Sequence, residues 1–158
     1  GLTGHAEVVR VVWNNCEIDL SDLLKLFWEC HDPTQGNRQG NDTGSQYRSV
    51  IYTTSKDQLS KAMESKNSYQ KELQKKGFGS ITTEIEKDIK FYFAEDYHQQ
   101  YLAKPGSRPY CSAMPTKVTF KDFNGSNFKL NEKIWSHYNW DISHCILRGD
   151  NTPIDSNL

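Results

Sequence analysis

The spacing of apolar and polar positions predicts a strand over residues 6–13, which are rich in β-branched valine. Side chains two apart share one face of a strand, so Glu7 lies on the same face as Val9, Val11 and Trp13. On a buried face, desolvation favours the neutral carboxyl group, which suits Glu7 as a proton donor. At a strand start open to water, Glu7 is instead an ordinary surface residue. The pattern leaves both alternatives open.

Two amphipathic helices follow. The first opens at Asp19 and ends before Pro33, and the second runs from a capping box at Ser55 to about Lys76, with Gly77 as its stop. Their apolar faces recur at helical spacing. The face of the first helix is Leu20, Leu23, Leu24, Phe27 and Trp28, and that of the second is Leu59, Ala62, Met63, Tyr69 and Leu73. Residues 47–53, 81–85 and 91–93 read as further strands, and residues 94–102 as a short helix.

Residues 31–49 are almost entirely polar, although they join two well-patterned elements. A long polar connection in a compact domain is either disordered or functional. We favour a shaped site, because Asp42, Tyr47 and Arg48 are chemically capable side chains beside a predicted strand.

Composition narrows the function classes. The 158 residues are 35% hydrophobic and 12% aromatic, which is sufficient for one core. The 19 basic and 20 acidic residues provide no basic surface of the kind that nucleic acid requires. No stretch approaches the roughly 18 apolar residues of a membrane span, so the composition predicts a soluble protein. With no targeting segment in the sequence, the cytoplasm is the expected location, and an organelle stays possible.

Four cysteines are widely scattered, with no spacing that resembles a zinc site: Cys16, Cys30, Cys111 and Cys145. Cys111 lies in a proline-rich loop predicted to be exposed, as a resolving thiol requires. His98 in the short helix is either a structural residue or a catalyst, and Asp96 beside it could serve a hydrolase, although no nucleophile stands at a suitable spacing. We expect the aromatic-rich tail from Phe120 to dock on the domain.

Six ordered blocks resemble the peptide-methionine (S)-S-oxide reductase (MsrA) family. They are residues 3–9, 31–34, 38–42, 46–49, 81–85 and 94–101, which read TGHAEVV, HDPT, RQGND, QYRS, ITTEI and AEDYHQQY. The resemblance covers roughly residues 3–104. It implies an α+β fold of two layers, a mixed sheet with flanking helices of the ferredoxin-like MsrA type.

The resemblance also implies a reaction. In the family a cysteine thiolate attacks the sulfoxide sulfur, methionine leaves, and a second cysteine resolves the sulfenic acid to a disulfide that thioredoxin reduces. The family's acid falls on Glu7, its loop acid on Asp42 and its tyrosine hydroxyl on Tyr47. Cys111 matches the place of a resolving thiol, and Cys145 is a weaker alternative. No bound metal or organic cofactor is expected, since thioredoxin or a dithiol supplies the electrons.

The sequence departs from the family at one decisive place. The nucleophile of the family lies in a Gly-Cys-Phe-Trp-Gly motif upstream of the first matching block, and that motif is not found in the 158 residues. We therefore expect the N-terminal strand and helix of the fold to be missing. Cys16 and Cys30 lack the motif's neighbours, so we do not expect either to replace the nucleophile.

Two functions follow from the resemblance. The first is reduction of methionine-(S)-sulfoxide in proteins or peptides, by a full-length form expected to be monomeric and served by thioredoxin. The alternative is a non-catalytic module that binds methionine sulfoxide or a protein partner through the remaining pocket. The predicted organisation is an MsrA-like region over residues 1–104, followed by a loop-rich extension over 105–158.

Overall fold

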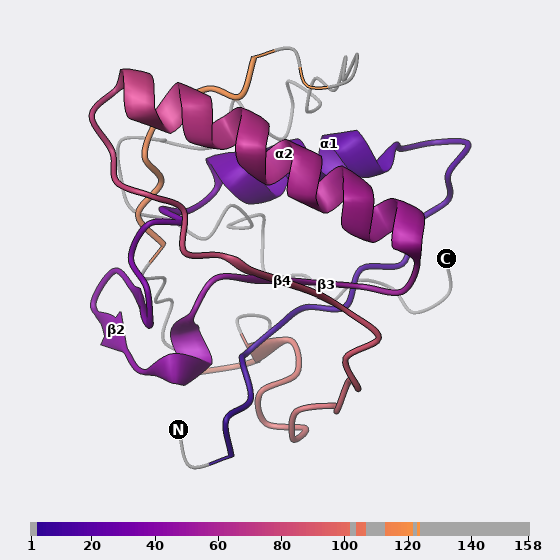
Figure 1. Ribbon diagram of the computed structural model, residues 1–158. Coiled ribbons are helices and arrows are strands. Elements are labelled where there is room, and N and C mark those ends of the chain that lie inside the picture. Colours follow the sequence, from indigo (N-terminus) through magenta and orange to yellow (C-terminus); the bar gives the residue numbers. More distant parts are fainter. Residues whose placement is uncertain (1–2, 102–103, 107–112, 122, 124–158) are drawn as a thin grey trace.

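Two helices lie on one side of a pair of strands in the computed structural model (Figure 1), which describes residues 3–101, 104–106, 113–121 and 123. In chain order the elements are α1 (Leu20–Glu29), β1 (Arg38–Gln39), β2 (Asp42–Thr43), the 3₁₀ turn η1 (Ser45–Tyr47), β3 (Val50–Thr53), α2 (Lys56–Lys75) and β4 (Glu84–Lys87).

Both helices begin where the sequence predicts. At α1 the Asp19 side chain accepts a hydrogen bond from the Ser21 N–H (2.7 Å), and the Asp22 side chain accepts one from the Asp19 N–H (3.1 Å). At α2 the Ser55 hydroxyl oxygen accepts from the Gln58 N–H (3.1 Å). These contacts satisfy backbone donors that have no partner inside a helix.

The strands form two small sheets of opposite type. β3 and β4 are parallel, with Val50 opposite Glu84, and α2 connects them as a crossover. β1 and β2 are antiparallel and turn at Gly40, whose φ of +55° is typical of a glycine in a two-residue hairpin. The helices cover one side of the parallel pair, and their combination with small sheets of both types confirms the predicted α+β class.

The core lies where α1, α2 and a segment close to residue 120 meet. Its buried apolar members are Leu24, Trp28, Ala62, Tyr69, Leu73, Ile81, Val118, Phe120 and Phe123. The Trp28 indole N–H donates to the Ser65 hydroxyl oxygen (2.9 Å), and the Tyr69 hydroxyl donates to the Val118 carbonyl (2.9 Å). Docking of the aromatic tail is confirmed for Phe120 and Phe123; its later residues lie outside the described part.

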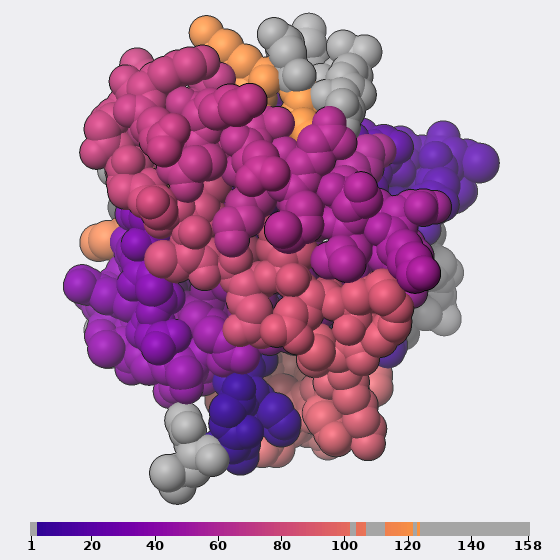
Figure 2. Space-filling view, in the orientation of Figure 1, coloured from indigo at the N-terminus to yellow at the C-terminus, as the bar shows by residue number. Residues whose placement is uncertain are grey.

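The predicted strand over residues 6–13 is wrong. The segment is extended without belonging to a sheet, and Val9 and Val12 are 87% and 85% exposed. Within the described residues, one backbone hydrogen bond ties it to another segment, from the Glu7 N–H to the Gln46 carbonyl (2.9 Å). Strand propensity alone does not make a strand, because a ladder needs a neighbour to pair with. The described N-terminal residues, in indigo, lie at the lower edge of the molecule (Figure 2).

Two further predictions near residue 95 are also wrong. Residues 91–93 belong to no strand, and residues 96–100 form turns in place of an α-helix. The His98 N–H donates to the Glu95 carbonyl (2.9 Å), three residues back, and Gln100 has a φ of +49°. A left-handed residue interrupts α-helical hydrogen bonding. The aromatic pattern of this segment is therefore compatible with turns.

Across the described residues, no helix is long and apolar enough to cross a membrane.

Candidate functional site

The polar loop between α1 and β3 is folded, which confirms a shaped segment over a disordered linker. The Asp32 carboxylate accepts hydrogen bonds from the N–H (2.9 Å) and the hydroxyl (2.7 Å) of Thr34, and from the side chain of Gln35 (3.3 Å). The Gln35 side-chain oxygen in turn accepts from the Gly40 N–H (2.7 Å). Side chains thus supply partners for those backbone N–H groups of the loop that lie outside the β1–β2 ladder.

Thr82 fastens this loop to the segment that leads into β4. Its N–H and hydroxyl both donate to the Pro33 carbonyl, at 2.9 and 3.0 Å. The Thr82 hydroxyl oxygen also accepts from the Gly36 N–H (3.0 Å). The loop is therefore held against the parallel sheet.

His31 fastens the other end of the loop. Its Nδ1 contacts the Phe27 carbonyl oxygen (2.7 Å), and its Nε2 contacts the Ser49 hydroxyl oxygen (2.8 Å). A carbonyl can only accept, so Nδ1 carries the hydrogen and Nε2 of the neutral ring accepts from Ser49. Burial lowers the pKa of His31, in agreement with a neutral ring. Ser49 also contacts the Thr83 hydroxyl (2.8 Å), which extends the chain of contacts to β4.

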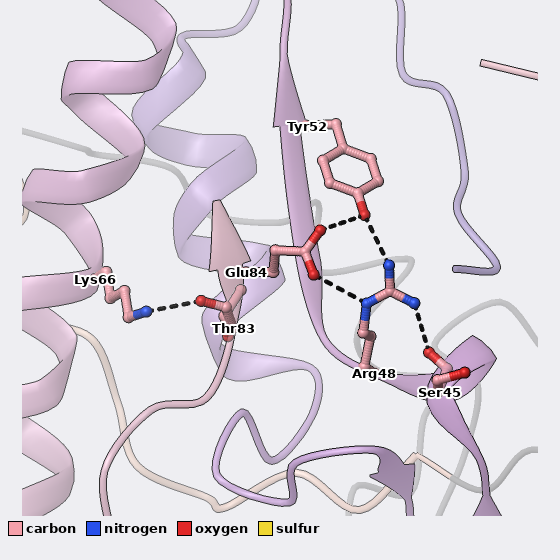
Figure 3. A network of polar contacts seen from close by, with 6 residues as sticks. All are labelled: Ser45, Arg48, Tyr52, Lys66, Thr83 and Glu84. Atoms are coloured by element: carbon pink, nitrogen blue, oxygen red, sulfur yellow. Dashed lines mark hydrogen bonds and ion pairs between the residues drawn. The ribbon is translucent and has the colours of Figure 1, made fainter. Parts of the chain in front are cut away.

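Arg48, Glu84 and Tyr52 form a closed polar cluster on the sheet (Figure 3). Arg48 Nε donates to Glu84 Oε2 (3.0 Å), Arg48 Nη2 donates to the Tyr52 hydroxyl oxygen (3.2 Å), and that hydroxyl donates to Glu84 Oε1 (2.7 Å). The hydrogen bond from Tyr52 is the main cause that lowers the pKa of Glu84, and Arg48 adds to it. Burial, reinforced by the bond to Glu84, raises the pKa of Tyr52.

The turn η1 lies between this cluster and the N-terminal segment. The Gly44 N–H donates to the Asn37 carbonyl (2.9 Å), and the Tyr47 N–H donates to the Gly44 carbonyl (3.0 Å). On its far side, the Gln46 carbonyl accepts from the Glu7 N–H (2.9 Å). The backbones of two predicted site residues, Glu7 and Tyr47, therefore meet at one turn.

The local setting of these residues differs from the expectation. Tyr47 lies half-buried in a 3₁₀ turn and not at the start of a strand, and Asp42 lies half-buried in β2. Glu7 is exposed. Of the two alternatives for its carboxyl group, a buried face or a position open to water, the structure therefore shows the position open to water. Cys111 and Cys145 lie outside the described residues.

The other candidate residues lie outside η1. Cys16 is exposed in the connection before α1, and Cys30 is half-buried at the end of α1, where its thiol donates to the Phe27 carbonyl (3.2 Å). His98 is exposed beside Tyr97. Across the described part of the chain, no group of three His, Cys, Asp or Glu side chains is placed to hold a metal ion.

The family model for peptide methionine sulfoxide reductase matches residues 1–131 of this chain. The chain belongs to the peptide methionine sulfoxide reductase family. It is 58% identical over 119 residues to the mitochondrial peptide methionine sulfoxide reductase of Bos taurus, a match that covers 75% of this chain and 51% of the relative. It is 56% identical over 118 residues to the MsrA of Pseudomonas putida, covering 75% and 53%. The chain thus spans about half the length of the curated relatives it matches.

Solved structures of this family have a similar fold. Methionine sulfoxide reductase A of Corynebacterium diphtheriae superposes with a TM-score of 0.64 at 44% identity, over 69% of this chain and 55% of the other. Reduced Mxr1 of Saccharomyces cerevisiae superposes with a TM-score of 0.55 at 39% identity, over 63% and 52%.

Sequence reasoning missed two members of the polar cluster in this chain. Glu84 and Tyr52 were assigned only to strands, whereas they bind the Arg48 side chain. One signal was present: Arg48 and Tyr52 are four residues apart in an extended segment, so they share a face. The sequence could not indicate Glu84 as the partner on β4, because the register of the parallel pair depends on how the crossover helix α2 aligns the two strands.

Proposed function

We propose that this chain supplies the oxygen-binding part of a reductase that converts methionine-(S)-sulfoxide in proteins or peptides to methionine. Membership of the family supports the substrate class. The hydrogen bond from the Glu7 N–H to the Gln46 carbonyl is the observation that supports this site. It brings the backbones of the proposed acid, Glu7, and the proposed tyrosine, Tyr47, to one turn.

The proposed chemistry reduces one sulfoxide and oxidises two thiols. A thiolate attacks the sulfoxide sulfur, and the oxygen, as it gains negative charge, receives its proton from Glu7. The oxygen then passes to the attacking sulfur as methionine leaves, which gives a cysteine sulfenic acid. The Tyr47 hydroxyl donates to the same oxygen, and Asp42 orients the polar loop around it. A resolving thiol, assigned to Cys111, then forms a disulfide with the attacking sulfur and releases water. Thioredoxin or a dithiol reduces that disulfide.

The attacking thiolate is not assigned to any residue of this sequence. Cys16 and Cys30 are not proposed for this role, because neither has the sequence neighbours of the family's nucleophile motif. Oxidised proteins and thioredoxin are the proposed partners, a monomer is the proposed state of the full-length protein, and no cofactor is proposed. Cytoplasmic location stays a prediction, since some relatives are named as mitochondrial.

Binding and turnover of a blocked methionine sulfoxide test the proposal separately. By ligand-observed NMR we expect the S epimer to bind more tightly than the R epimer, and Tyr47→Phe to weaken that binding several-fold by removing one hydrogen bond. Tyr97→Phe, at an exposed tyrosine outside η1, is the matched control. Equal binding of the two epimers, or full binding by Tyr47→Phe, would refute the assigned site.

Turnover is measured with dithiothreitol as reductant. We expect none from this chain, because the attacking thiolate lies in the family's Gly-Cys-Phe-Trp-Gly motif. Stereospecific reduction would show that one of its own cysteines attacks, and replacing each by serine in turn would identify it. In an active full-length form, Glu7→Gln should lower kcat more than it changes KM; an unchanged kcat would remove Glu7 from the acid role.

A further inference from the structure

The turn that carries Tyr47 is bound on two sides through consecutive carbonyl groups. The Ser45 carbonyl accepts from Arg48 Nη1 (2.8 Å), and the Gln46 carbonyl accepts from the Glu7 N–H (2.9 Å). A three-residue 3₁₀ turn has little hydrogen bonding of its own. Its position, and with it the positions of Glu7 and Tyr47, therefore depends on these outside contacts.

The guanidinium group that holds Ser45 is itself fixed by both strands of the parallel sheet. Glu84 in β4 accepts from Arg48 Nε (3.0 Å), and Tyr52 in β3 accepts from Nη2 (3.2 Å). Because the guanidinium is planar, two bonds to the sheet set the direction of the third. In Figure 3 the group lies between the Glu84 carboxylate and the Tyr52 hydroxyl on one side and Ser45 on the other.

We propose that Arg48 is a positioning residue for sulfoxide binding, which transmits the rigidity of β3 and β4 to the turn that carries Tyr47 and anchors Glu7. The effect of Arg48 on sulfoxide binding rests on the proposed function, whereas the claim that Arg48 fixes the turn does not. Arg48 acts through the Ser45 carbonyl and not through contact with substrate.

The geometry separates this role from that of a simple link between strands. A link between β3 and β4 needs only the bonds to Glu84 and Tyr52, yet Nη1 reaches out of the sheet to the turn. Lysine retains the positive charge beside Glu84 but has no planar fork, so it cannot bind two strand side chains and the turn in the same directions. Arg48→Lys therefore separates positioning from charge.

The test compares Arg48→Lys and Arg48→Ala with Lys61→Ala, which removes an ion pair to Asp19 far from the turn. Amide hydrogen exchange reports the turn, through the N–H groups of Glu7 and Tyr47. Urea unfolding reports the whole molecule, and NMR titration reports affinity for the blocked (S)-sulfoxide. These three readouts are independent of catalytic turnover.

For Arg48→Lys we expect about tenfold faster exchange at Glu7 and Tyr47 and about tenfold weaker sulfoxide binding, the effect of one lost hydrogen bond. Exchange within α2 should stay unchanged. Tyr52→Phe, which removes one of the two strand contacts, should show a smaller change in the same direction. Lys61→Ala should alter neither the two amides nor the affinity.

Unchanged exchange at Glu7 and Tyr47 in Arg48→Lys and Arg48→Ala would overturn the inference, even if both variants lose stability. Unchanged sulfoxide affinity in a variant with a loosened turn would equally overturn it. If the unsubstituted chain binds no sulfoxide, the proposed function fails, while the exchange data still decide whether Arg48 fixes the turn.

Discussion

His31 connects the end of α1 to β3 through both nitrogen atoms of one buried ring. The ring is neutral in the folded chain, because burial lowers its pKa and both neighbours suit one tautomer. In the unfolded chain the imidazole binds a proton near pH 6.5. Below that pH the unfolded state binds more protons, so the free energy of unfolding falls as the solution is acidified.

We therefore expect stability to be full well above pH 6.5 and to fall progressively as the pH is lowered through about 6.5, towards the lower pKa of the folded state. His31→Gln should remove most of this change in the free energy of unfolding with pH, whatever its effect on stability at pH 8. Urea unfolding at a series of pH values measures the pH dependence, and His98→Gln, at an exposed histidine, is the control that should retain it. An unaltered slope in His31→Gln would assign the pH dependence to another group.

Gly44 adopts a backbone conformation that is nearly restricted to glycine. Its φ is +147° and its ψ is +157°, a backbone conformation that a residue with a Cβ adopts only with strain. We expect Gly44→Ala to lower the free energy of unfolding by about 1–3 kcal/mol. Gly79 has no positive φ and open space around it, so Gly79→Ala should be neutral or slightly stabilising. Similar urea midpoints for the two variants would contradict the strain at Gly44.

At the scale of elements, local chemistry made the helices predictable. Asp19, Ser55 and Gly77 act within one turn of sequence, so their capping roles can be read from neighbours alone. Strands depend on partners far away in the chain. Residues 6–13 have strand composition and no ladder. The turn η1 replaces the expected start of β3, because it is held by the Arg48 side chain, which Tyr52 of β3 and Glu84 of β4 fix in turn.

Tyr69 of α2 contacts the segment near residue 120 through both its ring and its hydroxyl. Its ring is fully buried and packs against Phe120 (5.1 Å between ring centres), its hydroxyl donates to the Val118 carbonyl, and burial raises its pKa to about 12. Tyr69→Phe keeps the packing and leaves that carbonyl without its donor. We expect a loss of about 1–3 kcal/mol in the free energy of unfolding.

Thermal or urea unfolding measures the loss, and amide exchange near Val118 should accelerate with it. Tyr97→Phe is the matched control, because Tyr97 is exposed and should change stability by less than about 0.5 kcal/mol. If Tyr69→Phe matches this control, the contact with Val118 does not hold the segment.

At the scale of the whole molecule, the stability lost on substituting a side chain should depend on how deeply that side chain is buried and not on how hydrophobic it is. Leu24 is buried between the helices, and Leu24→Ala should lower the free energy of unfolding by about 2–5 kcal/mol. Val9 and Val12 are as apolar but exposed, so Val9→Ser and Val12→Ser should stay within about 0.5 kcal/mol. Chemical denaturation of the three variants measures this contrast; a large loss for Val9→Ser would mean that residues 6–13 pack in solution.

The α+β class and the place of the polar loop followed from sequence, because periodicity and capping residues carry that information. The candidate site followed only in part. The sequence indicated Glu7, Asp42 and Tyr47 through family-like blocks, and their roles stay predictions. It could not show that Glu84 binds Arg48, since that pair depends on how α2 aligns β3 with β4.

That alignment has a consequence for how fast the chain folds. β3 and β4 are neighbours in space, but the whole of α2 separates them in sequence, so their contact requires closure of a long loop. A preformed helix shortens the search, because its two ends are then held at a fixed separation. We expect the capped α2 to form early and the strand pair with its Arg48 cluster to form late, which makes helix propensity in α2 a determinant of the refolding rate.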